Sequence, residues 1–282
     1  MRKALFVINP LREEAKSAAK ELAELLSLED FSISTISDVS IDGIDSDSNL
    51  EGIEIAVVLG GDGTILRAAE ATRALDVPVL GVNLGRVGFL AEVDRLSLHA
   101  VARSIIEKSY TTDNRMVIRY SVERAGMEIS SGWALNEVTV ERNAEAMVEL
   151  FVQIDGRPLS RWGCDGVICA TPTGSTAYAF SAGGPVVWPA VEALVVEPIN
   201  AHALFARPMV VSPSSTVVIE VESDEAHLSA DALRKVSLCE HDRISITKDE
   251  KGVKLAHVQP TTFTDRLVAK FKLPIEGWRG ER

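Results

Sequence analysis

Short apolar runs alternate with helix-like patterns in the first part of the chain. The runs are, in order, ALFVIN (4–9), REEAKSAAKELAELL (12–26), IEIAVVLGG (53–61), ILRAAEATRAL (65–75), VPVLGVN (77–83) and LHAVARSIIEK (98–108). This order predicts parallel strands joined by right-handed helical crossovers. Ligands of such sheets bind beyond the carboxyl ends of the strands, where residues 60–64 and 81–89 lie.

From about residue 115 the apolar positions recur every second residue instead. The segments with this period are MVIRYSVER, GWALNEVTVER, AMVELFVQIDGRPL, PMVVSPSSTVVIEVES and DRISITKDEKGVKLAHV. The pairs Asp155-Gly156 and Lys251-Gly252 fall where hairpin turns are expected. The pattern therefore predicts antiparallel sheets that pack together.

A helix-like stretch, TFTDRLVAKF, follows near the end of the chain and is expected to return to the first domain. The predicted fold is a Rossmann-like α/β domain over residues 1–114 and a β-sandwich domain over residues 115–258. Residues 259–282 form a C-terminal segment that packs back on the α/β domain.

Composition and charge narrow the class of protein. The 282 residues are 46% hydrophobic and 25% charged, enough for one large or two ordinary domains. The sequence has no run that approaches a membrane span and no signal-peptide pattern, so we expect a cytoplasmic protein without a membrane partner. A net charge of −12 argues against nucleic acid as a partner. The acidic residues of segment 37–52 predict a solvated loop.

The stretch VVLGGDGTILRAAE (57–70) places the carboxylate of Asp62 within a glycine-rich turn from strand to helix. Such a turn presents backbone N–H groups to anions, and a carboxylate about 4 Å from a phosphate opposes binding by about 4 kcal/mol. Either no phosphate comes close, or Asp62 has a chemical role. The loop matches neither common phosphate-binding fingerprint. In the alternative interpretation, Asp62 or Thr64 only caps the helix that starts at Ile65.

A second stretch, CDGVICATPTGSTAYAFSAGGP (164–185), runs from an apolar strand through small and hydroxyl residues into a helical pattern near Tyr178. Its hydroxyl groups and the Tyr178 ring are suited to a polar ligand that carries a base. The G-x-S-x-G motif of a nucleophile elbow is absent. We interpret the stretch as a ligand cradle, with a hydroxyl-rich turn that bonds its own backbone as the alternative.

Two further features concern single residues. In WALNEVTVER, Asn136 shares a face with Val138 and Val140, which predicts a buried amide, while Glu137 points the other way unless a bulge intervenes. The five histidines show no metal-ligand spacing, and the three cysteines show no paired C-x-x-C spacing. The sequence therefore predicts neither a metal site in the protein nor a disulfide framework.

Together these stretches resemble the NAD kinases. The shared motifs are GGDGT (60–64), NE (136–137), DG (165–166) and TPTGSTAYAFSAGGP (171–185), with NLGRVGFL (83–90) and ARPMVVSP (206–213). GGDGT also occurs in diacylglycerol-type lipid kinases and phosphofructokinases, whereas TPTGSTAY is more specific. One departure lies in HLSADALRK (227–235), where Ala232 follows Asp231 in place of the family's usual glycine. Asp231 is therefore not assigned to the site.

The resemblance implies phosphoryl transfer to the adenosine ribose 2′-OH of NAD, with Asp62 as the base that accepts the hydroxyl proton. The implied dinucleotide-binding residues are Asp62, Gly63, Asn136, Glu137, Asp165, Thr173, Thr176, Ala177, Tyr178, Ala179, Phe180 and Ser181. The implied phosphate or donor-binding residues are Gly60, Gly61, Gly63, Thr64, Arg67 and Gly163. The resemblance also implies a divalent ion, Mg²⁺ or Mn²⁺, that arrives on the donor phosphates.

The resemblance implies ATP as the donor and, because Gly163 stands where ATP-restricted relatives carry a polar side chain, polyphosphate as well. A bulge before Asp165 is the other interpretation of Gly163. The resemblance further implies a homo-oligomer, a tetramer or dimer formed through the β-rich domain. Two alternatives stay open, namely a lipid or sugar kinase that shares only GGDGT, and a non-catalytic NAD(P)-binding sensor.

Overall fold

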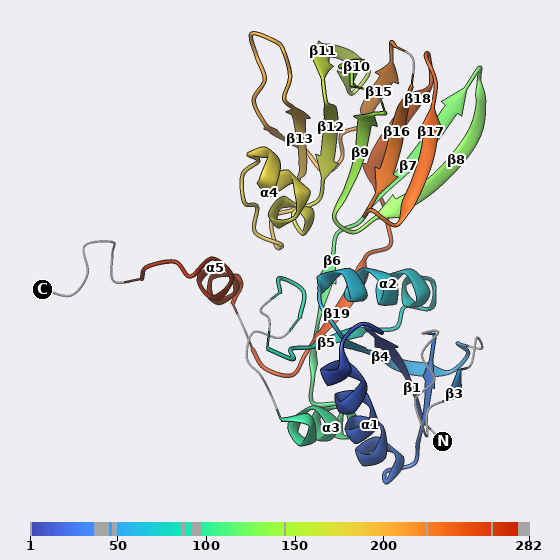
Figure 1. The fold of residues 1–282 in the computed structure, drawn as a ribbon, viewed down its shortest axis with the longest axis vertical. Coiled ribbons are helices and arrows are strands. Elements are labelled where there is room, and N and C mark those ends of the chain that lie inside the picture. The colour runs from blue at the N-terminus through green and yellow to red at the C-terminus, as the bar shows by residue number, and fades with distance from the viewer. Residues whose placement is uncertain are drawn as a thin grey trace, which may run out of the picture. The chain divides into compact units, whose positions relative to one another are not determined.

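The computed structural model describes residues 2–36, 45–46, 50–85, 88–91, 97–143, 145–223, 225–260 and 262–275. The chain divides into two compact units, residues 1–114 with 253–282 and residues 115–252 (Figure 1). Most of the acidic segment 37–52, predicted to be a loop, lies outside the described residues. No helix among the described residues is long and apolar enough to cross a membrane.

The first unit is built on a seven-stranded sheet in the order β3-β2-β1-β4-β5-β19-β6. Its strands are β1 (Arg2–Ile8), β2 (Phe31–Thr35), β3 (Asp45–Ser46), β4 (Ile53–Leu59), β5 (Val79–Val82), β6 (Thr111–Arg115) and β19 (Val253–His257). Its helices are α1 (Glu13–Ser27), α2 (Asp62–Thr72), η1 (Arg73–Leu75), α3 (Leu98–Glu107) and α5 (Phe263–Phe271). The pairs β1–β2, β1–β4, β4–β5 and β5–β19 are parallel, as the strand–helix alternation predicts.

The central strands of this sheet are buried on both faces, which explains their continuous apolar runs. In β4, every residue from Ile55 to Leu59 is inaccessible to solvent. The helix α1 buries one stripe of alanine and leucine, which includes Ala15, Ala19 and Leu22, against the sheet. The three-to-four-residue period of that stripe is the pattern of an amphipathic helix.

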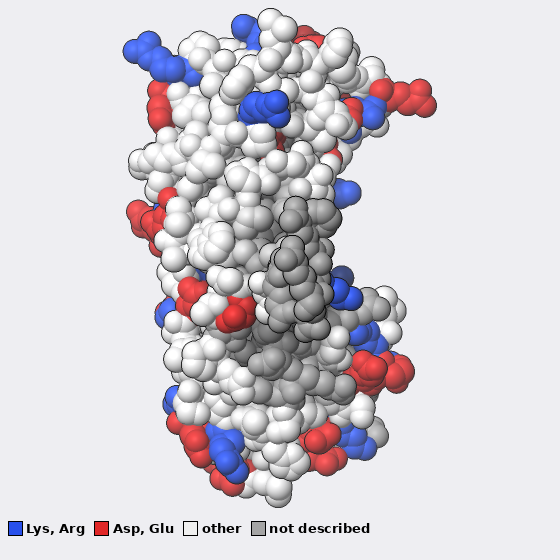
Figure 2. Space-filling model, turned by 90° about the vertical axis from the view of Figure 1, so that its left-hand side faces the viewer, with Lys and Arg blue, Asp and Glu red and all other residues white. Residues whose placement is uncertain are grey.

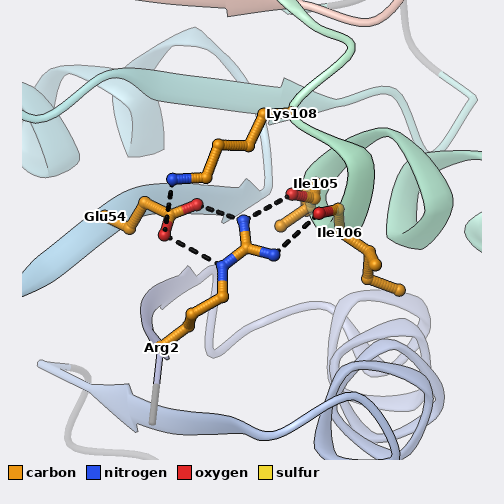
Figure 3. A network of polar contacts seen from close by, with 5 residues as sticks. All are labelled: Arg2, Glu54, Ile105, Ile106 and Lys108. Atoms are coloured by element: carbon orange, nitrogen blue, oxygen red, sulfur yellow. Dashed lines mark hydrogen bonds and ion pairs between the residues drawn. The ribbon is translucent and has the colours of Figure 1, made fainter.

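Charged side chains tie the first strand to the end of α3 (Figure 3). The Arg2 guanidinium donates to the carbonyl oxygens of Ile105 at 3.0 Å and Ile106 at 2.7 Å, in the last turn of the helix. Glu54 accepts from Arg2 Nε at 3.0 Å and pairs with Lys108 at 3.2 Å. The hydrogen bond from Arg2 lowers the pKa of the Glu54 carboxyl despite partial burial. Residues from β1, β4 and α3 are therefore joined in one polar network.

The second unit contains two six-stranded antiparallel sheets, with orders β11-β10-β15-β18-β7-β8 and β14-β13-β12-β9-β16-β17. Strands of the first are β7 (Ile118–Arg124), β8 (Met127–Ala134), β10 (Val148–Ile154), β11 (Arg157–Cys164), β15 (Val217–Val221) and β18 (Arg243–Lys248). Strands of the second are β9 (Glu137–Arg142), β12 (Gly166–Ala170), β13 (Leu194–Ile199), β14 (Met209–Val211), β16 (Ala226–Ala230) and β17 (Arg234–Leu238). Alternate residues of both sheets, with Trp162 the largest, fill one common core. The predicted sandwich is confirmed.

The two predicted hairpins had different outcomes. Asp155 and Gly156, both at positive φ, join the antiparallel strands β10 and β11, so this prediction is confirmed. The prediction at Lys251-Gly252 is wrong, because the strand after it, Val253–His257, is β19 and pairs in parallel with β5 of the first unit. A period of two identifies a strand but does not identify its partner. The β unit therefore ends at residue 252, before the predicted boundary at 258.

The C-terminal segment packs within the first unit. In α5, the rings of Phe263 and Phe271 lie 6.1 Å and 5.6 Å from the Phe89 ring, measured between centroids. Arg266, which is only 3% exposed, donates to the Phe89 carbonyl oxygen at 3.4 Å and to the Ala91 carbonyl oxygen. The helix thus supports the segment that follows β5.

Candidate active site

The glycine-rich loop of the first unit connects the end of β4 to the start of α2. Gly61 is the N-cap residue of α2, Asp62 is its first residue, and no side chain makes a cap hydrogen bond there. The interpretation of Asp62 or Thr64 as a helix cap is therefore wrong. A Cβ on Gly60 would lie 2.4 Å from the Thr64 hydroxyl oxygen, so Thr64 occupies the space that a side chain at position 60 would need.

Asp62 directs its carboxylate at the segment after β5. Its two oxygens accept the backbone N–H groups of Phe89 at 3.0 Å and Leu90 at 3.2 Å. A Cβ on Gly88 would lie 2.2 Å from Asp62 Oδ1, so only glycine permits this approach. Because β4 and β5 are neighbours in the sheet, the two loops meet beyond their carboxyl ends, where the parallel sheet predicts a ligand.

The rest of this loop is open. Gly61, Gly63 and Arg67 are exposed, and a Cβ on either glycine would have no neighbour within 4 Å. The first unit thus brings together the predicted residues Gly60, Gly61, Asp62, Gly63, Thr64 and Arg67. A ligand can approach the backbone of this loop closely beside an oriented carboxylate.

In the second unit, the chain changes sheets at Leu135 and Asn136, between β8 and β9. Asp231, at the turn between β16 and β17, accepts the N–H groups of Leu135 at 2.7 Å, Asn136 at 2.7 Å and Glu137 at 3.2 Å. Asp231 is 5% exposed. Burial raises the pKa of its carboxyl from 3.8 to about 6, although the three N–H groups counteract that rise. The Asp231 carboxylate therefore fixes the backbone of Leu135 to Glu137, which we call the β8–β9 crossover.

The crossover contacts the second predicted stretch directly. The Thr171 hydroxyl donates to the Leu135 carbonyl oxygen at 2.5 Å, and the Thr171 N–H donates to the Asn136 carbonyl oxygen at 2.8 Å. A Cβ on Gly174 would lie only 2.0 Å from that same Asn136 oxygen. Two segments that are distant in sequence therefore form one rigid wall.

Asn136 differs from its predicted environment, and its neighbour Glu137 is buried. Asn136 is half-buried rather than buried, because it lies in the crossover and β9 begins only at Glu137. Glu137 is 8% exposed, and its Oε2 has no hydrogen-bond partner among the described residues. Burial and then the charge of Asp231 raise the pKa of Glu137 from 4.5 to about 8, which the backbone N–H of Tyr178 partly opposes. Glu137 is therefore mostly protonated at neutral pH.

The hydroxyl-rich stretch is partly a self-bonded turn. The Ser175 hydroxyl donates to the Pro172 carbonyl oxygen and accepts the Val187 N–H at 2.9 Å, and the Thr176 hydroxyl donates to the Thr173 carbonyl oxygen at 3.2 Å. The self-bonded interpretation therefore holds for these two hydroxyl groups. These hydrogen bonds fix the shape of the loop between β12 and α4.

The loop leads through η2 (Gly174–Thr176) into α4 (Tyr178–Ala182), which presents several predicted residues. Tyr178, Phe180 and Ser181 are exposed, whereas Ala179 is buried in the apolar cluster beneath the helix. The Tyr178 hydroxyl donates to Glu141 at 3.1 Å. This hydrogen bond restrains the Tyr178 side chain, which remains partly exposed to solvent.

Asp165 and Gly163 lie at the junction of β11 and β12. Asp165 pairs with Arg142 at 2.7 Å and accepts from Asn200 at 2.8 Å. Gly163 belongs to the other sheet, where it pairs in regular register with Glu149. The bulge interpretation of Gly163 is wrong, because the register shift in this strand pair lies between Val152 and Gln153.

One buried carboxyl group near α4 escaped the sequence analysis. Glu197 on β13 is inaccessible to solvent, and neither of its oxygens has a hydrogen-bond partner among the described residues. A Cβ on Gly184, just after α4, would lie 2.6 Å from its Oε2. Burial raises the pKa of Glu197 from 4.5 to about 7. Its sequence context, LVVEPI, reads as an ordinary strand and gives no signal of this environment.

An oriented carboxylate in an open glycine loop, within an α/β unit that is followed by a β-sandwich, fits a kinase with a small-molecule substrate. Residues 46–110 match the model of the ATP-NAD kinase N-terminal domain, and residues 135–258 match that of the ATP-NAD kinase C-terminal domain. The chain therefore belongs to the NAD kinase family.

Individual proteins and solved structures that resemble this chain are also NAD or NADH kinases. The chain is 53% identical to NAD kinase 2 of Streptomyces avermitilis, over 82% of this chain and 78% of that protein. It is 43% identical to the NAD kinase of Mycobacterium bovis, over 99% of both. Among solved structures, yeast NADH kinase complexed with NADH matches with a TM-score of 0.83 and 27% identity, over 100% of this chain and 89% of that one. The Archaeoglobus fulgidus NAD kinase in complex with ATP matches with a TM-score of 0.74 and 28% identity, over 96% and 99%.

The close contact at Gly174 predicts that Gly174→Ala destabilises the β unit by about 3 kcal/mol or more, because backbone atoms of Asn136 cannot yield to a new methyl group. Gly163→Ala is the matched control, since its Cβ would meet only the flexible end of Glu149. Its expected effect is below about 1 kcal/mol. Urea unfolding measures both. Equal losses in the two variants would contradict the proposed rigid wall.

The buried Glu197 predicts a pH-dependent stability. Because its pKa is higher in the folded protein, its contribution is fully present below pH 4.5 and is lost as the pH rises through about 7. Glu197→Gln should therefore match the wild type near pH 4.5 and exceed its unfolding free energy by up to about 3 kcal/mol at pH 8. Glu192→Gln, an exposed control on the same unit, should show no such divergence. Parallel curves for Glu197→Gln and wild type would count against this account.

Proposed function

We propose that the chain transfers a phosphoryl group from ATP to the 2′-OH of the adenosine ribose of NAD, with formation of NADP. The observation that carries the proposal is the Asp62 carboxylate, oriented by two backbone N–H groups within an open glycine loop. A helix cap or a phosphate-binding turn does not require such a carboxylate. A kinase that deprotonates a hydroxyl group does.

In this mechanism Asp62 accepts the proton of the attacking 2′-OH. Each of its oxygens receives one N–H group, so each keeps a lone pair for the substrate hydroxyl. The backbone N–H groups of Gly61 and Gly63 and the Arg67 side chain balance the charge of the donor phosphates. The repulsion between Asp62 and phosphate is then tolerable.

The second unit supplies the proposed binding groups for the dinucleotide. Asn136 offers a half-exposed amide, and the Tyr178 ring offers a face to a base. Glu137, protonated at neutral pH, can donate its O–H to a ligand oxygen. The remaining proposed contacts in this unit are Asp165, Thr173, Thr176, Ala177, Ala179, Phe180 and Ser181, of which Ala179 can contribute only through its backbone because its side chain is buried. The first unit adds Gly63 to the proposed contacts, beside Asp62.

A divalent ion, Mg²⁺ or Mn²⁺, is proposed to enter on the donor phosphates and to neutralise part of their charge. No cluster of three or more His, Cys, Asp or Glu residues suited to a metal occurs in the described part of the chain. The loop of the first unit offers backbone N–H groups and one carboxylate, which fits an ion carried by the donor. A cytoplasmic location is proposed because the sequence shows no signal-peptide pattern and no run that approaches a membrane span, and the net charge of −12 supports the proposal that nucleic acid is not a partner.

Two alternatives have less support. A lipid or sugar kinase that shares only GGDGT would not match the C-terminal NAD kinase domain over residues 135–258. A non-catalytic NAD(P) sensor would bind the dinucleotide without any need for Asp62. Incubation with NAD, ATP and Mg²⁺, followed by an assay for NADP, separates the kinase from both.

The role of Asp62 predicts that Asp62→Asn abolishes phosphorylation but keeps NAD affinity within a fewfold, because an amide cannot accept the proton. General base catalysis is worth about 10² to 10⁴ in rate, so a variant with more than about a tenth of wild-type kcat would contradict the assignment. Calorimetry measures NAD affinity. Asp76→Asn, which removes an exposed carboxylate elsewhere in the first unit, is the control and should leave kcat unchanged.

Donor choice is proposed to depend on Gly163, which has no side chain to obstruct a phosphate chain that carries no adenine; a Cβ at this position would itself lie 2.6 Å from Glu149 Oε1. We expect NADP formation with polyphosphate as well as ATP, and we expect Gly163→Arg to reduce polyphosphate use far more than ATP use. Leu159→Arg in the same strand is the control. No NADP from polyphosphate, with ATP removed, would refute the donor proposal and leave the kinase assignment intact. An equal loss with both donors would assign Gly163 a role in folding.

The chain is also proposed to form a homo-oligomer, a tetramer or dimer, through the β unit. Figure 2 shows a largely uncharged surface on the side of this unit that carries α4 and β13. Exposed apolar side chains of the unit include Trp188, Val191, Leu204, Phe205 and Val210. Such exposure is typical of a surface that is covered by another chain. Light scattering at micromolar concentration should give a multiple of the monomer mass, and a monomeric mass would contradict the proposal.

A further inference from the structure

The turn between β16 and β17 has an unusual backbone. Asp231 and Ala232 have φ values of 51° and 55°, and the Leu233 N–H donates to the Ala230 carbonyl oxygen at 3.0 Å, as in a type I′ turn. Alanine is disfavoured in this left-handed region, where glycine is the usual residue. The turn nevertheless keeps this shape, in which the Asp231 carboxylate reaches the β8–β9 crossover.

The carboxylate restrains one side of the crossover and the TPTG loop restrains the other. Asp231 accepts three consecutive N–H groups, from Leu135 to Glu137, at 2.7 to 3.2 Å. On the opposite side, the Asn136 carbonyl oxygen accepts the Thr171 N–H, and Gly174 packs against it. Both peptide groups of Asn136 are therefore fixed, while its side chain remains half-exposed. Because its backbone is held in this way, the direction of the Cα–Cβ bond from which the Asn136 amide projects is fixed.

We propose that Asp231 is a positioning residue for dinucleotide binding, because it fixes the backbone from which the Asn136 amide and the Glu137 carboxyl project. This inference rests on the proposed function, in which those two groups contact the dinucleotide. Asp231 itself lies beneath the crossover and is 5% exposed, so it acts through its neighbours rather than on the ligand. The residue that the sequence left unassigned is thereby linked to the site.

A second buried aspartate distinguishes positioning from a purely structural role. Asp242 is inaccessible to solvent, accepts the Cys239 N–H at 2.8 Å and pairs with Arg124 at 2.7 Å. It belongs to the same unit and also binds a backbone N–H group at a turn, but it touches none of the proposed binding residues. Its loss should lower stability without a specific effect on NAD.

The experiment compares Asp231→Asn and Asp231→Ala with Asp242→Asn in the full chain. We expect Asp231→Ala to raise the KM and the dissociation constant for NAD about tenfold or more, and to leave the KM for ATP within about twofold. Asp231→Asn keeps one acceptor oxygen and should have an intermediate effect. Asp242→Asn should lower the melting temperature and leave both KM values unchanged. If the Asp231 variants lose stability but bind NAD as Asp242→Asn does, the proposal is refuted.

A double-mutant cycle tests the route of the effect. If Asp231 acts through Asn136 and Glu137, then Asp231→Asn should add little to the loss of NAD affinity already caused by the double substitution Asn136→Ala/Glu137→Ala. Fully additive losses would overturn the proposal. Should Asp231→Ala not fold, Asp231→Asn carries both tests. Calorimetric NAD affinity does not depend on turnover, so a wild type that binds NAD but forms no NADP would refute the kinase mechanism and leave the role of Asp231 testable.

Discussion

In each of the two units, hydrogen bonds from backbone N–H groups to a side-chain carboxylate hold the segment that carries candidate functional residues. Asp62 accepts two such groups from the segment after β5, and Asp231 accepts three from the β8–β9 crossover. A charged acceptor makes stronger hydrogen bonds than a neutral one, and an acceptor that is distant in sequence fixes a segment with no regular structure of its own. Each loop of the site thus obtains from an aspartate the rigidity that strands obtain from their ladders.

The same unit contains carboxyl groups whose environment favours the neutral form. Burial raises the pKa of Glu137 to about 8 and that of Glu197 to about 7, and the charge of Asp231 adds to the rise at Glu137. Both residues lie close to the 171–187 stretch, against Tyr178 and Gly184. Buried carboxyl oxygens without a hydrogen-bond partner in the described part of the chain, such as Glu137 Oε2 and both oxygens of Glu197, destabilise a fold, and buried carboxyl groups with raised pKa values beside proposed ligand contacts are typical of functional sites.

The β-rich half shows the limit of pattern-based prediction. The period of two correctly identified strands, and Asp155-Gly156 correctly identified a hairpin, because both signals are local. The strand Val253–His257 has the same pattern but pairs with β5 in the parallel sheet, and β8 and β9 belong to different sheets although only two residues separate them. The partner of a strand depends on non-local hydrogen bonds, which no local pattern records.

The sequence by itself determined the α/β and sandwich architecture, the position of the glycine loop and the motifs that resemble the NAD kinases, since each is carried by neighbouring residues. The tertiary structure decided how those residues are used. It showed that Asp62 binds Phe89 and Leu90 rather than capping α2, that Asn136 is half-buried, that Arg266 supports the Phe89 segment and that Glu197 is buried without a partner. It also showed that Asp231, to which the sequence assigned no role, accepts hydrogen bonds from the β8–β9 crossover. The sequence could not show this, because hydrogen-bond partners 94 to 96 positions apart come together only in the folded chain.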